Sequence, residues 1–138
     1  MNSIKESDLK AEWSLLQNQS DSYEKYSLLI KLANIGLLGA AYFSSSMSVF
    51  VVFLLLVVWL QDAIWKTYQS RINRRLLQLE NYLLNGVDGK AFQLNSDFLK
   101  SRSGVIQLIV ENLLQAIRPT VAFPHVVLVL MLGLLLIK

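Results

Sequence analysis

Apolar positions gather in three stretches of the chain. The first two, 28–43 and 47–60, are separated only by Ser44-Ser45-Ser46, and Lys31 is the sole charge in either stretch. The third runs from 120 to 137. A bilayer core about 30 Å thick is crossed by about 20 mostly apolar helical residues, and a link this short joins antiparallel helices. The pattern predicts a hairpin and a third span, with transmembrane helices at about 28–43, 46–65 and 120–137.

The 27 residues before the first span carry one helical stripe, spaced 4-3-4-3-4-3. Its members are Leu9, Trp13, Leu16, Ser20, Tyr23, Ser27 and Ile30. Two of them are serine, so the stripe is imperfect. Because no Pro or Gly lies between Asn2 and Asn34, we expect one helix that runs from water into the first span. The alternative is an amphipathic segment lying on the membrane surface.

The second span also continues beyond the membrane, because no Pro or Gly interrupts it before Gly86, a plausible helix C-cap. Its extension carries a stripe of Ile64, Tyr68, Ile72, Leu76, Leu79 and Leu83. Two amphipathic arms that leave the same membrane face predict a coiled-coil-like, antiparallel stalk. The packing residues that we expect in it are Trp13, Leu16, Tyr23, Tyr68, Ile72 and Leu76.

A third amphipathic helix is expected at about 96–117, with Gly104 as a weak point inside it and Pro119 ending or kinking it. Packing on the stalk is the favoured arrangement, and lying on the membrane surface is the alternative. Before this helix, residues 86–90 form a turn-rich segment. Its lone Asp88 does not make a calcium site.

Small residues share one face of the first span, at Ala33, Gly36 and Ala40. Small residues let helix backbones approach closely in lipid. We expect this face to pack against the second span.

Composition supports one membrane domain of 138 residues, 54% hydrophobic, with mean hydropathy +0.43. Its segments are 1–27 (amphipathic helix), 28–65 (hairpin), 66–118 (helical segment) and 119–138 (third span). A net charge of +3 is too mild to indicate nucleic acid, and the absence of cysteine excludes disulfides and thiolate chemistry.

Orientation follows from the eight basic residues in 66–118, against none in the serine turn. By the positive-inside rule, that segment and the N-terminus are cytoplasmic and the C-terminus is on the opposite side. We expect an integral protein of a bacterial inner membrane, with the lipid bilayer and a second copy or another membrane protein as partners.

Three ionisable residues in the spans are expected at similar depth. Counted from Ser45, Lys31 lies 14 residues before and Asp62 17 residues after, and His125 enters the third span from the same side. Such residues form ion or proton paths in some membrane proteins. The competing interpretation is structural: Lys31 snorkels to the headgroups, Asp62 reaches water and His125 bonds carbonyls that Pro124 leaves free.

A basic cluster of Arg71, Arg74 and Arg75 lies just outside the second span, where such clusters contact anionic headgroups or acidic partners. The sequence shows no catalytic set, no phosphate-binding glycine loop and no multi-histidine metal site. We therefore expect no cofactor.

An N-terminal helix with three spans in 138 residues resembles the layout of the small bacterial diacylglycerol kinases. No acidic motif of that family is matched, so the resemblance implies no site residues. The sequence favours a non-enzymatic accessory or scaffold subunit that acts through its cytoplasmic helices. One alternative is a homo-oligomeric channel or transporter. Another is a lipid-modifying enzyme, whose turnover would need Glu80 or Asp97.

Overall fold

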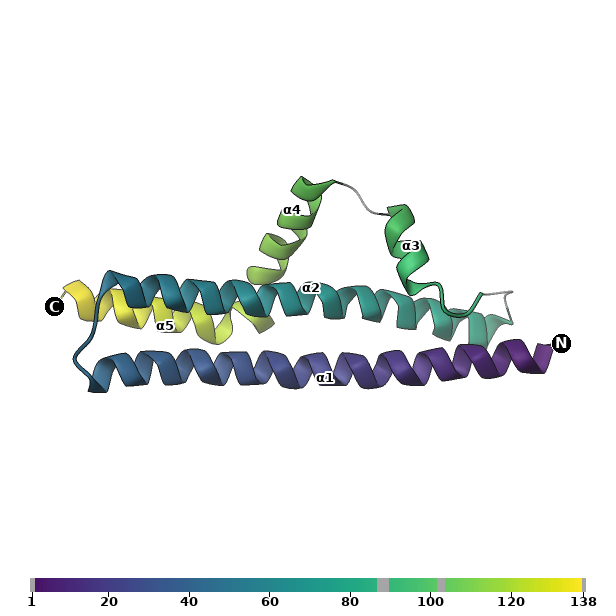
Figure 1. Cartoon of the computed structure of the whole chain (residues 1–138), viewed down its shortest axis with the longest axis horizontal. Coiled ribbons are helices and arrows are strands. Elements are labelled where there is room, and N and C mark those ends of the chain that lie inside the picture. The colour runs from purple at the N-terminus through teal and green to yellow at the C-terminus, as the bar shows by residue number, and fades with distance from the viewer. Residues whose placement is uncertain (1, 87–89, 102–103, 138) are drawn as a thin grey trace.

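The computed structural model describes residues 2–86, 90–101 and 104–137. These residues form helices and no strand, in the order α1 (Asn2–Phe43), α2 (Val49–Asn85), α3 (Leu94–Ser101), α4 (Val105–Ala116) and α5 (Pro119–Ile137) (Figure 1). Among the described helices, α1, α2 and α5 are long and apolar enough to span a membrane.

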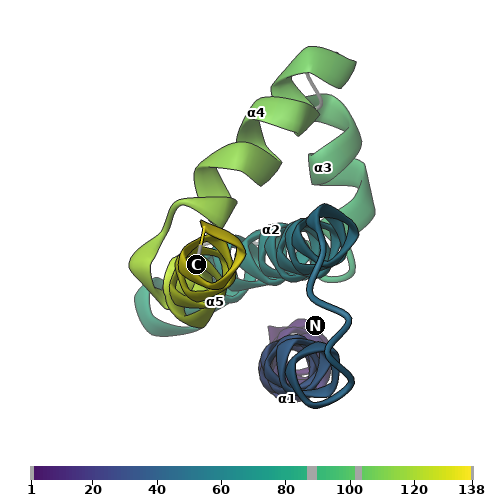
Figure 2. The same cartoon turned by 90° about the vertical axis from the view of Figure 1, so that its left-hand side faces the viewer.

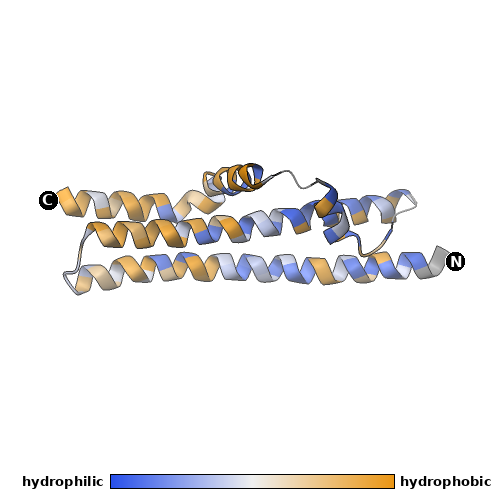
Figure 3. Cartoon of the chain, turned by 45° about the horizontal axis from the view of Figure 1, so that its top comes forward, coloured by the Kyte–Doolittle hydropathy of each residue, from blue (hydrophilic) through white to orange (hydrophobic). Residues whose placement is uncertain are grey.

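The three long helices lie side by side. α1 and α2 are antiparallel over their length, and α5 runs beside α2 to the end of the bundle where the α1–α2 turn lies (Figures 1 and 2). Hydropathy divides this bundle along its axis (Figure 3). We call 28–43 of α1, 49–65 of α2 and α5 the apolar half. The rest of α1 and α2, with α3 and α4, is the polar half.

The expected hairpin is present, but its turn is longer than the three serines. Ser45 has φ 54°, and Ser48 is extended and caps α2, which begins at Val49 instead of at 46. The Ser46 N–H donates to the Ala41 carbonyl at 3.0 Å, which closes the end of α1. Serine favours turns because its hydroxyl competes for backbone hydrogen bonds, and this explains the late start of α2.

The two unbroken arms are confirmed. α1 has 42 residues and α2 has 37, or about 63 Å and 55 Å at 1.5 Å per residue. Gly86 caps α2 with φ 61°, as expected for a left-handed C-cap.

A hydrophobic core lies in each half. In the apolar half it consists of Leu38, Ala41, Val51, Leu55, Leu128 and Leu132. In the polar half it consists of Leu9, Leu16, Ile72, Leu76 and Leu79, with Trp13 and Tyr23 packed against it. Of the expected stalk residues, Tyr68 departs from this arrangement, because it is 49% exposed and lies beside Arg71. Coiled-coil geometry stays a prediction.

The single helix expected over 96–117 is wrong. α3 ends at Ser101 and α4 begins at Val105, with Gly104 between them at φ −52° and ψ 179°. Glycine has the poorest helix propensity after proline, so the weak point became a break. α3 begins against the polar-half core at Leu94. α4 meets α2 at its C-terminal end and projects outward at a steep angle to the bundle axis (Figures 1 and 2). Residues 87–89, and with them Asp88, lie outside the described residues.

The small-residue face of α1 does not pack against α2, contrary to expectation. Ala33, Gly36 and Ala40 are exposed, whereas α1 meets its neighbours through Asn34 and Leu38. The buried stripe of the N-terminal arm continues straight into the span at 3-4 spacing, and this places the small residues on the outer side.

α5 is interrupted near its start. Pro119 is its first residue, a position that proline favours, and Phe123 is non-helical with ψ 130°. Pro124 has no backbone N–H and its ring disfavours a helical residue before it. The break therefore lies inside α5, four residues after Pro119.

Candidate functional site

A buried polar cluster lies where the apolar half meets the polar half, and Asp62 of α2 is its centre. The Ser27 hydroxyl donates to Asp62 Oδ1 at 2.5 Å, and His125 Nε2 lies 3.2 Å from Asp62 Oδ2. Lys31 Nζ lies 3.9 Å from the same oxygen. Asp62 and His125 are 0% exposed. The structure thus brings Lys31, Asp62 and His125 together, on α1, α2 and α5.

Asn34 connects the cluster to the imidazole. Its Nδ2 lies 2.6 Å from His125 Nδ1 and donates to the Leu55 carbonyl at 3.5 Å. With Asn34 as donor, Nδ1 of His125 accepts and Nε2 carries the proton that points at Asp62. This arrangement describes a neutral imidazole. Among the described residues, no donor lies within hydrogen-bond distance of the buried Oδ1 of Asn34.

Lys31 is held by a carbonyl that proline leaves without a donor. In a regular helix the Thr120 carbonyl accepts from the N–H four residues later, but that residue is Pro124. Lys31 Nζ donates to it at 2.7 Å. The lysine side chain is 18% exposed, so it is mostly enclosed and does not extend freely to water. The sequence had assigned freed carbonyls to His125, and the structure gives this one to Lys31.

Trp59 closes the cluster on the side of α4. Its indole stacks on the His125 ring, with centroids 6.2 Å apart and planes at 17°, and Nε1 donates to the Ala116 carbonyl at 3.2 Å. Trp59 and Ser27 were both missed as site residues. The position of Ser27 in the helical stripe of the first arm could have indicated that it is buried, but its polar side chain was counted against the stripe.

Further polar contacts join α1 and α2 in the polar half, next to the cluster. The Ser20 hydroxyl donates to Asn73 Oδ1 at 2.7 Å, and Lys66 Nζ donates to Glu24 at 2.5 Å. The hydrogen bond from Lys66, followed by that from Gln69, lowers the pKa of Glu24 below its ordinary value. Because that pKa is depressed, the stabilisation is present at neutral pH and is lost as pH falls through the lowered value.

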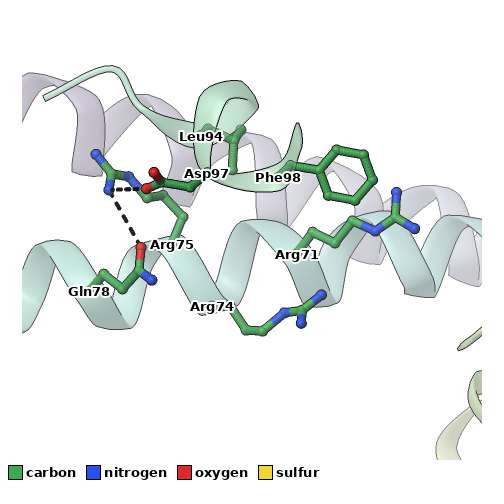
Figure 4. Close-up of a pocket in the computed structure, with 7 residues that line it drawn as sticks. All are labelled: Arg71, Arg74, Arg75, Gln78, Leu94, Asp97 and Phe98. Atoms are coloured by element: carbon green, nitrogen blue, oxygen red, sulfur yellow. Dashed lines mark hydrogen bonds and ion pairs between the residues drawn. The ribbon is translucent and has the colours of Figure 1, made fainter. Parts of the chain in front are cut away.

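The three arginines of the basic cluster have different surroundings (Figure 4). Arg75 is 3% exposed, and its guanidinium donates to Glu12 at 2.9 Å and to Asp97 at 3.3 Å. Arg71 donates to Glu111 at 3.1 Å and lies 4.3 Å from the Phe98 ring centroid. Arg74 makes no hydrogen bond or ion pair with the described residues. Arg75 and Arg71 are thus held by carboxylates of other helices, whereas Arg74 has no such partner among the described residues.

Chemically, the Asp62 cluster is closed and its charges are matched. Lys31 offsets Asp62, His125 Nε2 faces the same carboxylate, and Ser27 bonds to Asp62 and not to the imidazole. The pairing of nucleophile with base that covalent catalysis needs is therefore not formed here. No group of three or more His, Asp or Glu in residues 2–86, 90–101 and 104–137 is placed to hold a metal.

No protein-family model matches the sequence, and neither a curated protein nor a solved structure matches it. The likeness to the diacylglycerol kinases remains one of layout.

Proposed function

We propose that the protein is a non-enzymatic membrane scaffold that associates with copies of itself through the outer face of α1. The observation that carries this proposal is the exposure of Ala33, Gly36 and Ala40 in the apolar half. In lipid, helices associate by close backbone packing, and small residues at spacings of three and four favour it. The fold leaves this face free for another helix.

This face is open at Gly36. A Cβ placed on Gly36 has no atom within 4 Å, so the chain's own fold does not require glycine there. A second copy is the simplest occupant, because a two-fold arrangement lets the same face meet itself. The polar halves of the copies would then stand side by side.

The Asp62 cluster supports the same proposal by holding the three spans in one arrangement. It joins Ser27, Lys31 and Asn34 of α1 to Asp62 of α2 and His125 of α5. Removing one partner of such a buried set leaves an uncompensated charge or donor. We infer a rigid membrane base for the polar half, which we place in the cytoplasm of a bacterial cell because of its basic residues.

Energy transfer between differently labelled copies in lipid bilayers tests self-association. The chain has no cysteine, so Ser14→Cys on the exposed side of α1 carries the label alone. We expect transfer between native copies and its loss in Gly36→Leu, because the larger side chain separates the helices. Gly133→Leu is the matched control, since that α5 glycine also has open space around it.

Loss in Gly36→Leu with retention in Gly133→Leu supports the proposal. A native chain that gives no transfer, or a Gly36→Leu variant that keeps it, contradicts the proposal.

A proton path is the second candidate function, favoured by one observation. Asn34 Oδ1 is buried without a partner, and a turned amide would present it to a proton on His125 Nδ1. The imidazole would then carry two protons beside Asp62. Proton flux into liposomes distinguishes this function from a scaffold. For a lipid-modifying enzyme the support is weaker, because Glu80 bonds Trp13 and Asp97 bonds Arg75.

A further inference from the structure

A cavity of about 400 Å³ lies between α2 and α4, beside the junction of the two halves. Arg74 of α2 and Arg118, which follows α4, both line it. Neither guanidinium forms an ion pair with the described residues. The carboxylate in its wall, Glu111, is bound by Arg71 at 3.1 Å. Two uncompensated positive charges therefore face one cavity.

Uncharged amides add to these charges. Gln115 is 8% exposed, lines the cavity, and its side chain makes no hydrogen bond to the described residues. Asn73 also lines the cavity, and its Oδ1 accepts from Ser20, so its Nδ2 remains available as a donor. Two guanidinium groups with two amides are suited to a phosphate, because arginine binds phosphate oxygens through paired N–H donors.

If Asp62 marks the edge of the hydrocarbon, the end of the cavity at Thr67 lies at the outer edge of the headgroup layer. At 1.5 Å per residue, Thr67 is then about 8 Å and Arg74 about 18 Å further along α2. Helical side chains lean toward the N-terminus of their helix, which for α2 lies in the apolar half. Figure 4 shows the Arg74 side chain extending along α2 in the direction of Arg71, away from Gln78. Its guanidinium therefore points toward the apolar half.

The far side of α4 favours lipid over a soluble anion. Ile106, Ile109, Leu113 and Ile117 are 53–80% exposed and share the side opposite Glu111 and Gln115. α4 projects outward from the bundle at a steep angle to its axis (Figures 1 and 2), so it lies across the direction in which the three long helices run. A helix with this orientation, an apolar side and a polar side is suited to the membrane interface.

We propose that the cavity between α2 and α4 binds the phosphate of an anionic phospholipid, held by Arg74 and Arg118, while the apolar side of α4 contacts the acyl-chain boundary. The site is independent of self-association, since it lies on α2 and α4 and not on the outer face of α1.

Native mass spectrometry of the detergent-solubilised full chain tests the site by titration with phosphatidylglycerol or phosphatidylcholine. We expect one phosphatidylglycerol per chain, bound in preference to phosphatidylcholine. Arg74→Gln with Arg118→Gln should weaken that binding at least about tenfold, because two charge-assisted contacts are lost. Both positions are exposed, and circular dichroism checks that the variant keeps its helices.

The matched control is Lys25→Gln with Lys100→Gln, which removes two exposed cations that have no ion pair with the described residues and lie outside the cavity. Lys25 follows Glu24, which accepts a hydrogen bond from Lys66. Lys25 therefore lies at a position along the bundle axis close to that of the cavity. This control should bind phosphatidylglycerol as the native chain does. Equal weakening in both variants overturns the site, as does equal binding of the two lipids. Displacement by inorganic phosphate at a concentration equal to that of the lipid, at matched ionic strength, overturns the assignment to lipid.

Discussion

Asp62 shows how one side chain can hold three helices. Its two oxygens are approached by a hydroxyl, an imidazole and an ammonium group from α1 and α5, and it is 0% exposed. Burying a carboxylate is costly unless it is paired and hydrogen-bonded. The paired state therefore couples the positions of all three spans.

Replacing that carboxylate should be strongly destabilising. We expect Asp62→Leu to lower the free energy of unfolding by about 3–5 kcal/mol, because Lys31 loses its counter-charge and the buried Ser27 hydroxyl and His125 lose their partner. The double variant Lys31→Met/Asp62→Leu should recover part of the loss. Denaturant unfolding in detergent, followed by tryptophan fluorescence, measures both.

Asp21→Asn is the control for that experiment, because Asp21 is exposed and, within the described part of the chain, is hydrogen-bonded only to Gln17. It should change the free energy of unfolding by less than about 0.5 kcal/mol. An Asp62→Leu variant as stable as Asp21→Asn would show that the cluster does not hold the spans.

At this scale the sequence predicted part of the site. Depth counting from the serine turn placed Lys31 and Asp62 at one level, and the structure joins them at 3.9 Å. Nothing in the sequence indicated that Ser27 pairs with Asp62, because a serine in an apolar stripe can face solvent as easily as a neighbouring helix. Nor did it separate the three arginines, since their partners Glu12, Asp97 and Glu111 come from distant helices.

At the scale of elements, glycine decides where the helices of the polar half end. Gly86 stops α2 in a left-handed conformation, whereas Gly104 separates α3 and α4 with a negative φ. The first was predictable, because it follows the last periodic residue of a long helix. The second was underestimated, because the apolar residues Leu99 and Ile106, on either side of Gly104, are seven residues apart and would share one face of a continuous helix.

The two glycines should respond differently to alanine. Gly86→Ala places a Cβ in the left-handed region, which costs about 1–2 kcal/mol, and should speed amide exchange at residues 82–85. Gly104→Ala meets no atom within 4 Å and keeps an allowed φ, so exchange there should be unchanged. Equal exchange at residues 82–85 in the two variants would contradict the assigned cap.

The small-residue face shows why helix packing is harder to predict than helix position. The sequence favoured α2 as its partner because α2 is the nearest span. The structure instead aligns Asn34 and Leu38 with the buried stripe of the N-terminal arm. A continuous helix can turn only one stripe inward, and the polar contacts at Ser20 and Ser27 fix which one.

For the whole molecule, the separation into two halves follows from composition along the chain. Three apolar helices were predictable from run length, and the arms from uninterrupted periodicity. The angle of α4 was not, because it depends on the bonds of Trp59 to Ala116 and of Arg71 to Glu111. The Asp62 cluster is thus enclosed between the long helices, and α1 and α4 expose surfaces to which a partner could bind. This arrangement favours a scaffold over a proton path.

Proton flux into liposomes that contain the full chain tests this central claim most directly. A scaffold with a closed cluster gives the same flux as protein-free liposomes, measured with an internal pH dye under an imposed gradient. The control carries Lys31→Met, Asp62→Leu and His125→Leu, and its flux should equal that of the native chain. Flux through the native chain that this triple variant abolishes would contradict the scaffold and establish a proton path.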